Sequence, residues 1–184
     1  MRVSRDEAAR NRTKVVEAAA EKFRQRGYDG IGVVGLMEAA GLTHGGFYKQ
    51  FADKEALVVE ATEQALAENL GNWGEAIAKA PGDPLGTLRQ WYLSKEHIDR
   101  VGDGCAYAAL AAEAPRHGAA LQQVFEDAFE ESIARLVPDD DGSKDARAEA
   151  IRGMAQMVGS LVLARAVRRR ELAEEILKSG KKTR

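Results

Sequence analysis

The 184-residue chain contains only one cysteine and three histidines. A single cysteine excludes an intrachain disulfide and is compatible with a reducing cytoplasm. The histidines and the cysteine are too scattered to form a catalytic set or a metal site, and the sequence has no GxSxG, Walker or HExxH motif. We therefore expect a protein that is not an enzyme and that binds neither a metal nor a cofactor.

Long apolar runs and strand patterns are absent as well. No apolar run approaches the ~20 residues that a membrane-spanning helix needs, and residues 1–6 contain no apolar signal region. No alternation of period two indicates a β-strand, and no internal repeat is present. Hydrophobic residues at 45% and charged residues at 30% are ordinary for a globular protein. These features predict an all-α, cytoplasmic protein without a membrane partner.

Residues 41–51, GLTHGGFYKQF, are the most informative segment, because they predict the turn and second helix of a helix-turn-helix. Gly41 suits the turn, since a residue without a Cβ readily adopts a positive φ. The hydroxyl of Thr43 is placed to cap the next helix. Phe47 and Phe51 are four residues apart, so they share one face that we expect to be buried.

The flanking segments complete a small helical unit. Residues 11–26 predict a helix, ended by Gly27, whose apolar positions follow the helical repeat: Val16, Ala19, Ala20 and Phe23. A short helix is expected over residues 33–40, packed through Val34, Leu36, Met37 and Ala40. Asp53 is the expected N-cap of a further helix that continues through residues 76–78.

Together these segments resemble the TetR/AcrR family of bacterial transcriptional regulators. The resemblance covers roughly the first third of the chain in one unbroken order: AAAEKF at 18–23, GYDG at 27–30, AAGLT at 39–43, GFYKQF at 46–51 and DKEAL at 53–57. One departure is Gly32, where the family usually has Ser or Thr as a helix cap; a glycine cap is only modestly weaker. The resemblance implies a DNA-binding domain over residues 1–54 and a helical effector-binding and dimerisation domain over residues 55–184.

The charge distribution agrees with this division. Residues 1–54 carry ten lysines and arginines against seven acids, whereas residues 55–184 carry seventeen against twenty-two. The basic end coincides with the helix-turn-helix, as expected for the electrostatic footprint of a DNA-binding domain. The small excess of positive charge in residues 1–54 predicts a modest number of phosphate contacts and a moderate salt dependence of DNA binding.

Thr43, His44 and Gly45 begin the expected recognition helix, where side chains reach base edges in the major groove. The small side chains of Gly45 and Gly46 would let the backbone approach the DNA. His44 is the best candidate for a base contact, and the alternative is a surface histidine that touches only phosphate.

Phosphate contacts are expected from Tyr48 and Lys49. Lys54 resembles a family lysine that meets phosphate at the start of the next helix; the alternative is an exposed lysine on a solvated turn. Arg5, Arg10 and Arg12 are weaker candidates for backbone contacts from an N-terminal arm, because charged tails are usually only solvated.

The remainder of the chain predicts helices over residues 85–101, 119–137, 146–168 and about 169–178, with a short segment over 105–113. Residues 146–168 are apolar on more than one face, which indicates more than one burial partner. We expect this helix and residues 119–137 to form both the core and a two-fold dimer interface, with small residues at Gly153, Gly159 and Ser160. The alternative is the core of a larger bundle. Asp139, Asp140 and Asp141 predict a solubilising turn without calcium.

A ligand pocket is expected among aromatic and sulfur-containing residues that suit an apolar or aromatic molecule: Trp91, Tyr92, Cys105, Tyr107, Phe125, Phe129, Met154 and Met157. His97 is a candidate polar group there. Cys105 follows two glycines and begins a helix, which would lower the pKa of its thiol and suit an electrophile or oxidant sensor. The alternative is a packed, inert cysteine, since free cysteine is often buried and no basic residue is adjacent in sequence.

These observations predict a homodimeric repressor that binds a palindromic operator in double-stranded DNA and is released by a small-molecule effector. Three alternatives remain: a thiol-sensing repressor acting through Cys105, a transcriptional activator, and a helical protein-interaction module without DNA binding.

Overall fold

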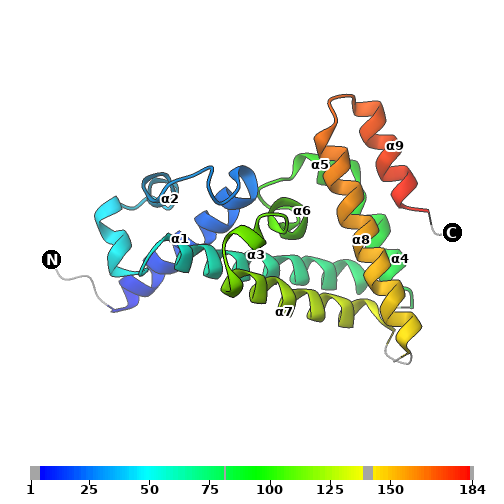
Figure 1. The fold of residues 1–184 in the computed structure, drawn as a ribbon, viewed down its shortest axis with the longest axis horizontal. Coiled ribbons are helices and arrows are strands. Elements are labelled where there is room, and N and C mark those ends of the chain that lie inside the picture. Colours follow the sequence, from blue (N-terminus) through cyan, green and yellow to red (C-terminus); the bar gives the residue numbers. More distant parts are fainter. Residues whose placement is uncertain (1–4, 81, 139–142, 183–184) are drawn as a thin grey trace.

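The computed structural model describes residues 5–80, 82–138 and 143–182, and all regular structure within them is helical. The molecule is elongated, with the N-terminal helices at one end and the two C-terminal helices at the other (Figure 1). No helix among the described residues is both long and apolar enough to cross a membrane. The expected acidic turn at residues 139–141 lies outside the described residues.

The N-terminal unit consists of three helical segments: α1 (Arg5–Arg26), α2 (Val33–Ala39) and the 3₁₀ helix η1 (His44–Lys49). Gly27 and Gly41, with φ of 73° and 70°, end α1 and α2 in the left-handed region that favours glycine. Gly32 occupies the N-cap position of α2 in an extended conformation, as the sequence predicted.

Two local expectations for this unit were wrong. Thr43 has the extended backbone of an N-cap, but its hydroxyl makes no capping hydrogen bond, and its carbonyl accepts from the Gly46 N–H at 3.0 Å instead. That pattern belongs to a 3₁₀ turn, which a segment with two glycines forms in place of a full α-helix. Val34 is 52% exposed, whereas Leu36 and Met37 of the same helix are buried as expected.

Helix α3 (Lys54–Ile77) runs from the N-terminal unit into the rest of the molecule (Figure 1). Its N-terminus is capped as expected, since the Asp53 carboxylate accepts from the Ala56 N–H at 2.8 Å. Its buried residues recur at helical spacing along its whole length, and they pack on α1 at one end and on α7 further along. One continuous helix therefore joins the two parts of the chain.

The remaining helices are α4 (Pro84–Tyr92), α5 (Lys95–Asp99), α6 (Ala106–Leu110), η2 (Ala114–Arg116), α7 (Ala119–Leu136), α8 (Lys144–Ala166) and α9 (Arg170–Gly180). Helices α4, α6 and α7 pack on α3, and α8 packs on these three helices in turn. The expected single helix over residues 85–101 is broken after Tyr92, because Leu93 leaves helical geometry and Ser94 starts α5 from an extended conformation. The break buries Leu93, which is 1% exposed, beside Gly180 of α9.

Helix α9 is fastened to the rest of this domain by packing and by ion pairs. Gly180 leaves room for Ser160 of α8, where a Cβ would lie 2.4 Å from the serine Oγ. Lys95 pairs with Glu174 at 2.8 Å, and Arg170 pairs with Asp99 at 3.2 Å, so α9 is tied to α5 as well. Helices α8 and α9 therefore form a pair at the edge of the molecule (Figure 1).

Candidate DNA-reading surface and effector cavities

The segment η1 presents its polar side chains outward and buries its phenylalanines. Phe47 and Phe51 are 0% and 3% exposed, and their rings stack at 5.4 Å between centroids. Tyr48 is 67% exposed, and His44 and Lys49 are exposed beside it. A buried aromatic anchor thus supports one edge on which an imidazole, a phenol and an ammonium face solvent.

The two glycines of η1 lie in different surroundings. A Cβ at Gly45 would meet no described atom within 4 Å, so this position is open to an approaching surface. A Cβ at Gly46 would lie 3.6 Å from the Met37 Cε. Gly46 therefore faces α2, and among the two glycines only Gly45 lies where the backbone is open from outside. Thr43 is exposed immediately before them.

Lys54 and Arg12 make contacts inside the domain. The Lys54 ammonium donates to the Tyr28 carbonyl at 2.5 Å, which places it at the turn between α1 and α2. The Arg12 guanidinium donates to the Gln50 carbonyl, pairs with Glu60 and lies over the Phe51 ring. Arg12 therefore does not lie in a solvated arm, whereas Arg5 and Arg10 are exposed on α1.

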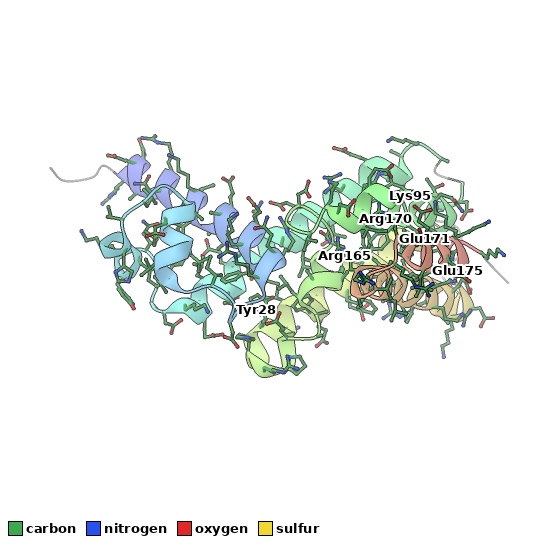
Figure 2. All side chains as sticks on the ribbon, turned by 90° about the horizontal axis from the view of Figure 1, so that it is seen from above. Tyr28, Lys95, Arg165, Arg170, Glu171 and Glu175 are labelled. Carbon is green, nitrogen blue, oxygen red and sulfur yellow. The ribbon has the colours of Figure 1, made fainter. Side chains whose placement is uncertain are left out.

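Tyr28 joins the N-terminal unit to the rest of the chain. Its ring is fully buried, its hydroxyl lies 2.8 Å from the Thr62 Oγ1, and burial raises the pKa of this phenol above its ordinary value. Its backbone N–H donates to the Glu113 carboxylate at 3.2 Å. The His117 ring packs on Tyr28 at 4.8 Å between centroids, and its Nδ1 lies 3.1 Å from the Glu55 carboxylate. Figure 2 shows Tyr28 at this junction.

The expected ligand residues are divided between two cavities. The first, of about 340 Å³, is bordered by Trp91, His97 and Cys105 together with polar residues of α3 and of the segment after α5. It is a polar depression, since asparagine, glutamate, arginine and aspartate side chains contribute to its wall. Tyr92 and Met157, which were also expected to line a pocket, are 0% and 1% exposed and border neither cavity.

Cys105 does not have the activated thiol that its helix-start position predicted. It is 2% exposed, and burial raises the pKa of the thiol. The side-chain amide of Asn69 lies against it, 3.4 Å from Sγ. The Arg165 guanidinium favours the thiolate, but its effect is smaller than that of burial. The expected low pKa was therefore wrong, because a five-residue helix supplies too little field to offset desolvation.

His97 is a structural bridge beside Cys105. Its Nδ1 lies 2.8 Å from the Tyr92 carbonyl, and the Cys105 N–H donates to its Nε2 at 3.3 Å. Burial lowers the pKa of His97 to about 4, so the ring is neutral at pH 7, with the proton on Nδ1. Arg165 of α8 donates to the carbonyls of residues 97, 98 and 100, which fixes the segment that carries this histidine.

The second cavity, of about 510 Å³, lies between α6, α7 and α8. It brings together four of the expected residues: Tyr107, Phe125, Phe129 and Met154. The Tyr107 hydroxyl lies 3.1 Å from the Ser132 Oγ, so its ring faces the cavity while its polar end is satisfied. Among the lining residues only Glu126 is charged. This apolar, aromatic wall suits a ligand with extended nonpolar surface.

Several lining residues were not predicted from the sequence. Ala114 and Pro115 of η2, and Ile151, Ala155 and Val158 of α8, complete the wall of the second cavity. The spacing of the α8 residues was the available signal, because they share one apolar face of that helix with Met154. No group of three or more histidine, cysteine or acidic side chains is arranged to hold a metal among the described residues.

Comparison with known proteins agrees with this geometry. Residues 15–61 match the model of a family described as bacterial regulatory proteins, tetR family. The chain is 36% identical over 90 residues to the HTH-type transcriptional regulator AcrR of Shigella flexneri, a match that covers 48% of this chain and 41% of the relative. It is 33% identical over 98 residues to the HTH-type transcriptional regulator TtgR of Pseudomonas putida, covering 50% and 44%. The chain thus spans less than half the length of these curated relatives.

The fold likeness extends over nearly the whole chain. The crystal structure of a TetR transcriptional regulator from Chloroflexus aurantiacus superposes with a TM-score of 0.79 at 24% identity, covering 96% of this chain and 94% of that one. At this identity the likeness shows the fold alone, while the N-terminal matches carry the relationship by sequence. By sequence, residues 15–61 are similar to the tetR family of bacterial regulatory proteins, and the chain as a whole has the fold of solved TetR-family regulators.

Proposed function

We propose that this chain is a homodimeric, DNA-binding transcriptional repressor that leaves its operator when a small molecule occupies the effector domain. The observation that carries this proposal is the exposed edge of η1. His44, Tyr48 and Lys49 face solvent there while Phe47 and Phe51 anchor the segment. An exposed polar edge on a buried support is what a recognition segment needs to enter a major groove.

The residues of this edge take different roles. Thr43, His44 and Gly45 stand at its N-terminal end, where recognition helices reach base edges, and Tyr48 and Lys49 are suited to phosphate oxygens. Lys54 has three ammonium donors and uses one on the Tyr28 carbonyl, which leaves others for a phosphate. In this role Lys54 would link the DNA backbone to the turn that holds Tyr28.

Dimerisation places two recognition segments on one duplex, about one helical turn or a multiple of it apart. The exposed apolar side chains of α8 support this helix as part of the interface: Val162 and Leu163 are 41% and 58% exposed. A groove beside them is lined by Leu172 and Ile176 of α9. Helix α7 instead packs on α3 and α8. The exposed surface therefore favours α8 with α9, rather than α8 with α7, as the dimerising pair.

The second cavity is the better effector site, because a short segment connects it to the DNA-binding unit. Ala114 and Pro115 line this cavity, and the residues on either side of η2, Glu113 and His117, contact Tyr28 and Glu55. A ligand that shifts η2 would change these contacts and favour a conformation in which the two recognition segments no longer fit one duplex.

The test is selection of duplexes from a random-sequence library by the purified protein, which assumes no operator position. Enrichment of a two-fold symmetric site, bound with a salt-dependent affinity, is expected. The His44→Ala variant should bind the selected site less selectively. Failure to enrich any sequence, with the folded protein at micromolar concentration, would overturn DNA recognition and favour the interaction-module alternative.

A further inference from the structure

We propose that Arg12 is a positioning residue for DNA recognition, which holds the end of η1 against α3 and does not itself bind phosphate. This inference rests on the proposed DNA binding. Three contacts of one guanidinium support it. It donates to the Gln50 carbonyl, pairs with the Glu60 carboxylate of α3, and lies 4.2 Å from the centroid of the Phe51 ring.

The end of η1 needs such a restraint. Gln50 is the C-cap residue, and its carbonyl follows the last helical residue, where helix carbonyls lack an intrahelical partner. The segment is a six-residue 3₁₀ helix with two glycines, so its own hydrogen bonds and propensities stabilise it weakly. The side-chain oxygen of Gln50, Oε1, is buried and has no hydrogen-bond partner among the described residues. The Arg12 contact therefore supplies this residue with a charged donor from α1.

Arginine suits this position better than lysine. A planar guanidinium can donate to a carbonyl and a carboxylate with its edge while its face lies on an aromatic ring. An ammonium is a compact point charge and cannot keep all three contacts at once. The guanidinium comes from α1, the carbonyl and the ring from the two residues that follow η1, and the carboxylate from α3. The guanidinium therefore fixes how the end of the recognition segment sits on α1 and α3.

The pairing with Glu60 also separates this role from phosphate binding. The Arg12 and Glu60 side chains are 42% and 34% exposed and carry opposite charges, so their combined field toward DNA is small. If Arg12 bound a phosphate, its loss would reduce the slope of log affinity against log salt by about 0.9. If it only positions η1, affinity falls while the slope stays the same.

The first experiment compares Arg12→Lys with the unaltered protein on the selected duplex and on a scrambled duplex at several salt concentrations. We expect about tenfold weaker binding to the selected duplex, the factor that corresponds to one charge-assisted hydrogen bond. Scrambled DNA should bind equally well. Because lysine keeps the positive charge, the salt slope is measured on Arg12→Gln, for which affinity should fall while the slope stays the same. Lys14→Ala is the matched control, since Lys14 is exposed on α1 and makes no ion pair within the described chain.

A second variant, Glu60→Gln, should change the affinity for DNA in opposite directions under a purely electrostatic role and under the positioning role. Removing an acid from a DNA-binding domain should strengthen binding if electrostatics alone matters. Loss of the Glu60 contact should instead loosen Arg12 and weaken binding to the selected duplex by a few fold. Arg12→Lys with unchanged affinity, or Glu60→Gln with increased affinity, would overturn the positioning role.

A readout without DNA separates this proposal from the proposed function. The amide N–H groups of Gln50 and Phe51 both donate to the Phe47 carbonyl, so their hydrogen exchange reports the end of η1. Arg12→Lys should accelerate exchange at these two amides and leave the protected amides of α8 unchanged. If DNA binding itself were absent, this exchange result would still stand, and unchanged exchange would reject the role of Arg12.

Discussion

The imidazole of His117 lies beside the Glu55 carboxylate, with 3.1 Å between Nδ1 and Oε2. His117 follows η2, which borders the second cavity, whereas Glu55 stands in the first turn of α3, next to the DNA-binding unit. The His117 ring also packs on Tyr28. The two residues therefore connect the wall of the second cavity to the start of α3, beside the N-terminal unit.

Tyr28→Phe tests the strength of this junction. The Thr62 hydroxyl donates to the Val58 carbonyl at 2.7 Å, so the Tyr28 hydroxyl must donate to Thr62. Removing the hydroxyl from this buried site should lower the free energy of unfolding by about 1 kcal/mol, measured by urea denaturation. Tyr48→Phe makes the same chemical change at a side chain that is 67% exposed, and it should leave stability unchanged. Equal changes in the free energy of unfolding of the two variants would contradict the stabilising role of the Tyr28 hydroxyl at this junction.

Tyr48 and Lys49 can be tested together on DNA. The double variant Tyr48→Phe, Lys49→Ala should weaken binding to the selected and scrambled duplexes alike, because phosphate contacts carry no sequence information. Loss of one phosphate contact by the lysine should also reduce the salt slope by about 1. A changed sequence preference, seen by repeating the selection with the variant, would assign these residues to base recognition instead.

Protonation of His97 predicts a loss of stability in acid. The pKa of His97 is lowered to about 4 by burial, whereas an exposed histidine in the unfolded chain titrates near about 6.5. The unfolded state therefore binds more protons between these values, so stability falls as pH decreases from about 6.5 toward 4. This group should contribute about 2 kcal/mol of destabilisation between pH 7.5 and pH 5. The free energy of unfolding, measured by urea denaturation at both pH values, should differ less between them for His97→Gln than for the unaltered protein.

The thiol of Cys105 should react slowly in the folded protein. Its burial both blocks access and raises its pKa, which lowers the thiolate fraction near neutral pH. Ellman's reagent at pH 8 should modify it far more slowly in buffer than in urea. Rapid modification of the folded protein, with loss of DNA binding that Cys105→Ser prevents, would instead support the thiol-sensing alternative.

The local features of the fold were predictable because they depend on neighbouring residues. The ends of α1 and α2 follow from Gly27 and Gly41, and the start of α3 follows from the cap at Asp53, so short sequence signals were sufficient. The break after Tyr92 was not predictable in this way. It depends on burial of Leu93 beside α9, a contact between segments far apart in the chain.

The same limit applies to the candidate sites. The exposed face of η1 follows from the four-residue spacing of Phe47 and Phe51. Arg12, however, meets Gln50 and Glu60, which are 38 and 48 residues away, and Arg165 fixes the loop before Cys105 from 65 or more residues away. No local periodicity encodes such contacts. Sequence reasoning therefore assigned Arg12 to an arm and found no basic residue near the cysteine.

Leu163→Glu tests the proposed dimer. Leu163 is 58% exposed, so a charge there should cost the isolated fold little, but burying an unpaired carboxylate between two subunits is strongly unfavourable. Sedimentation velocity should show a shift from dimer to monomer, and binding to a two-fold symmetric duplex should weaken because the two half-sites would be bound independently. Val34→Glu changes another exposed apolar residue, 52% exposed on α2, and should leave the protein dimeric. A Leu163→Glu protein that remains dimeric would exclude this face of α8 as the core of the interface.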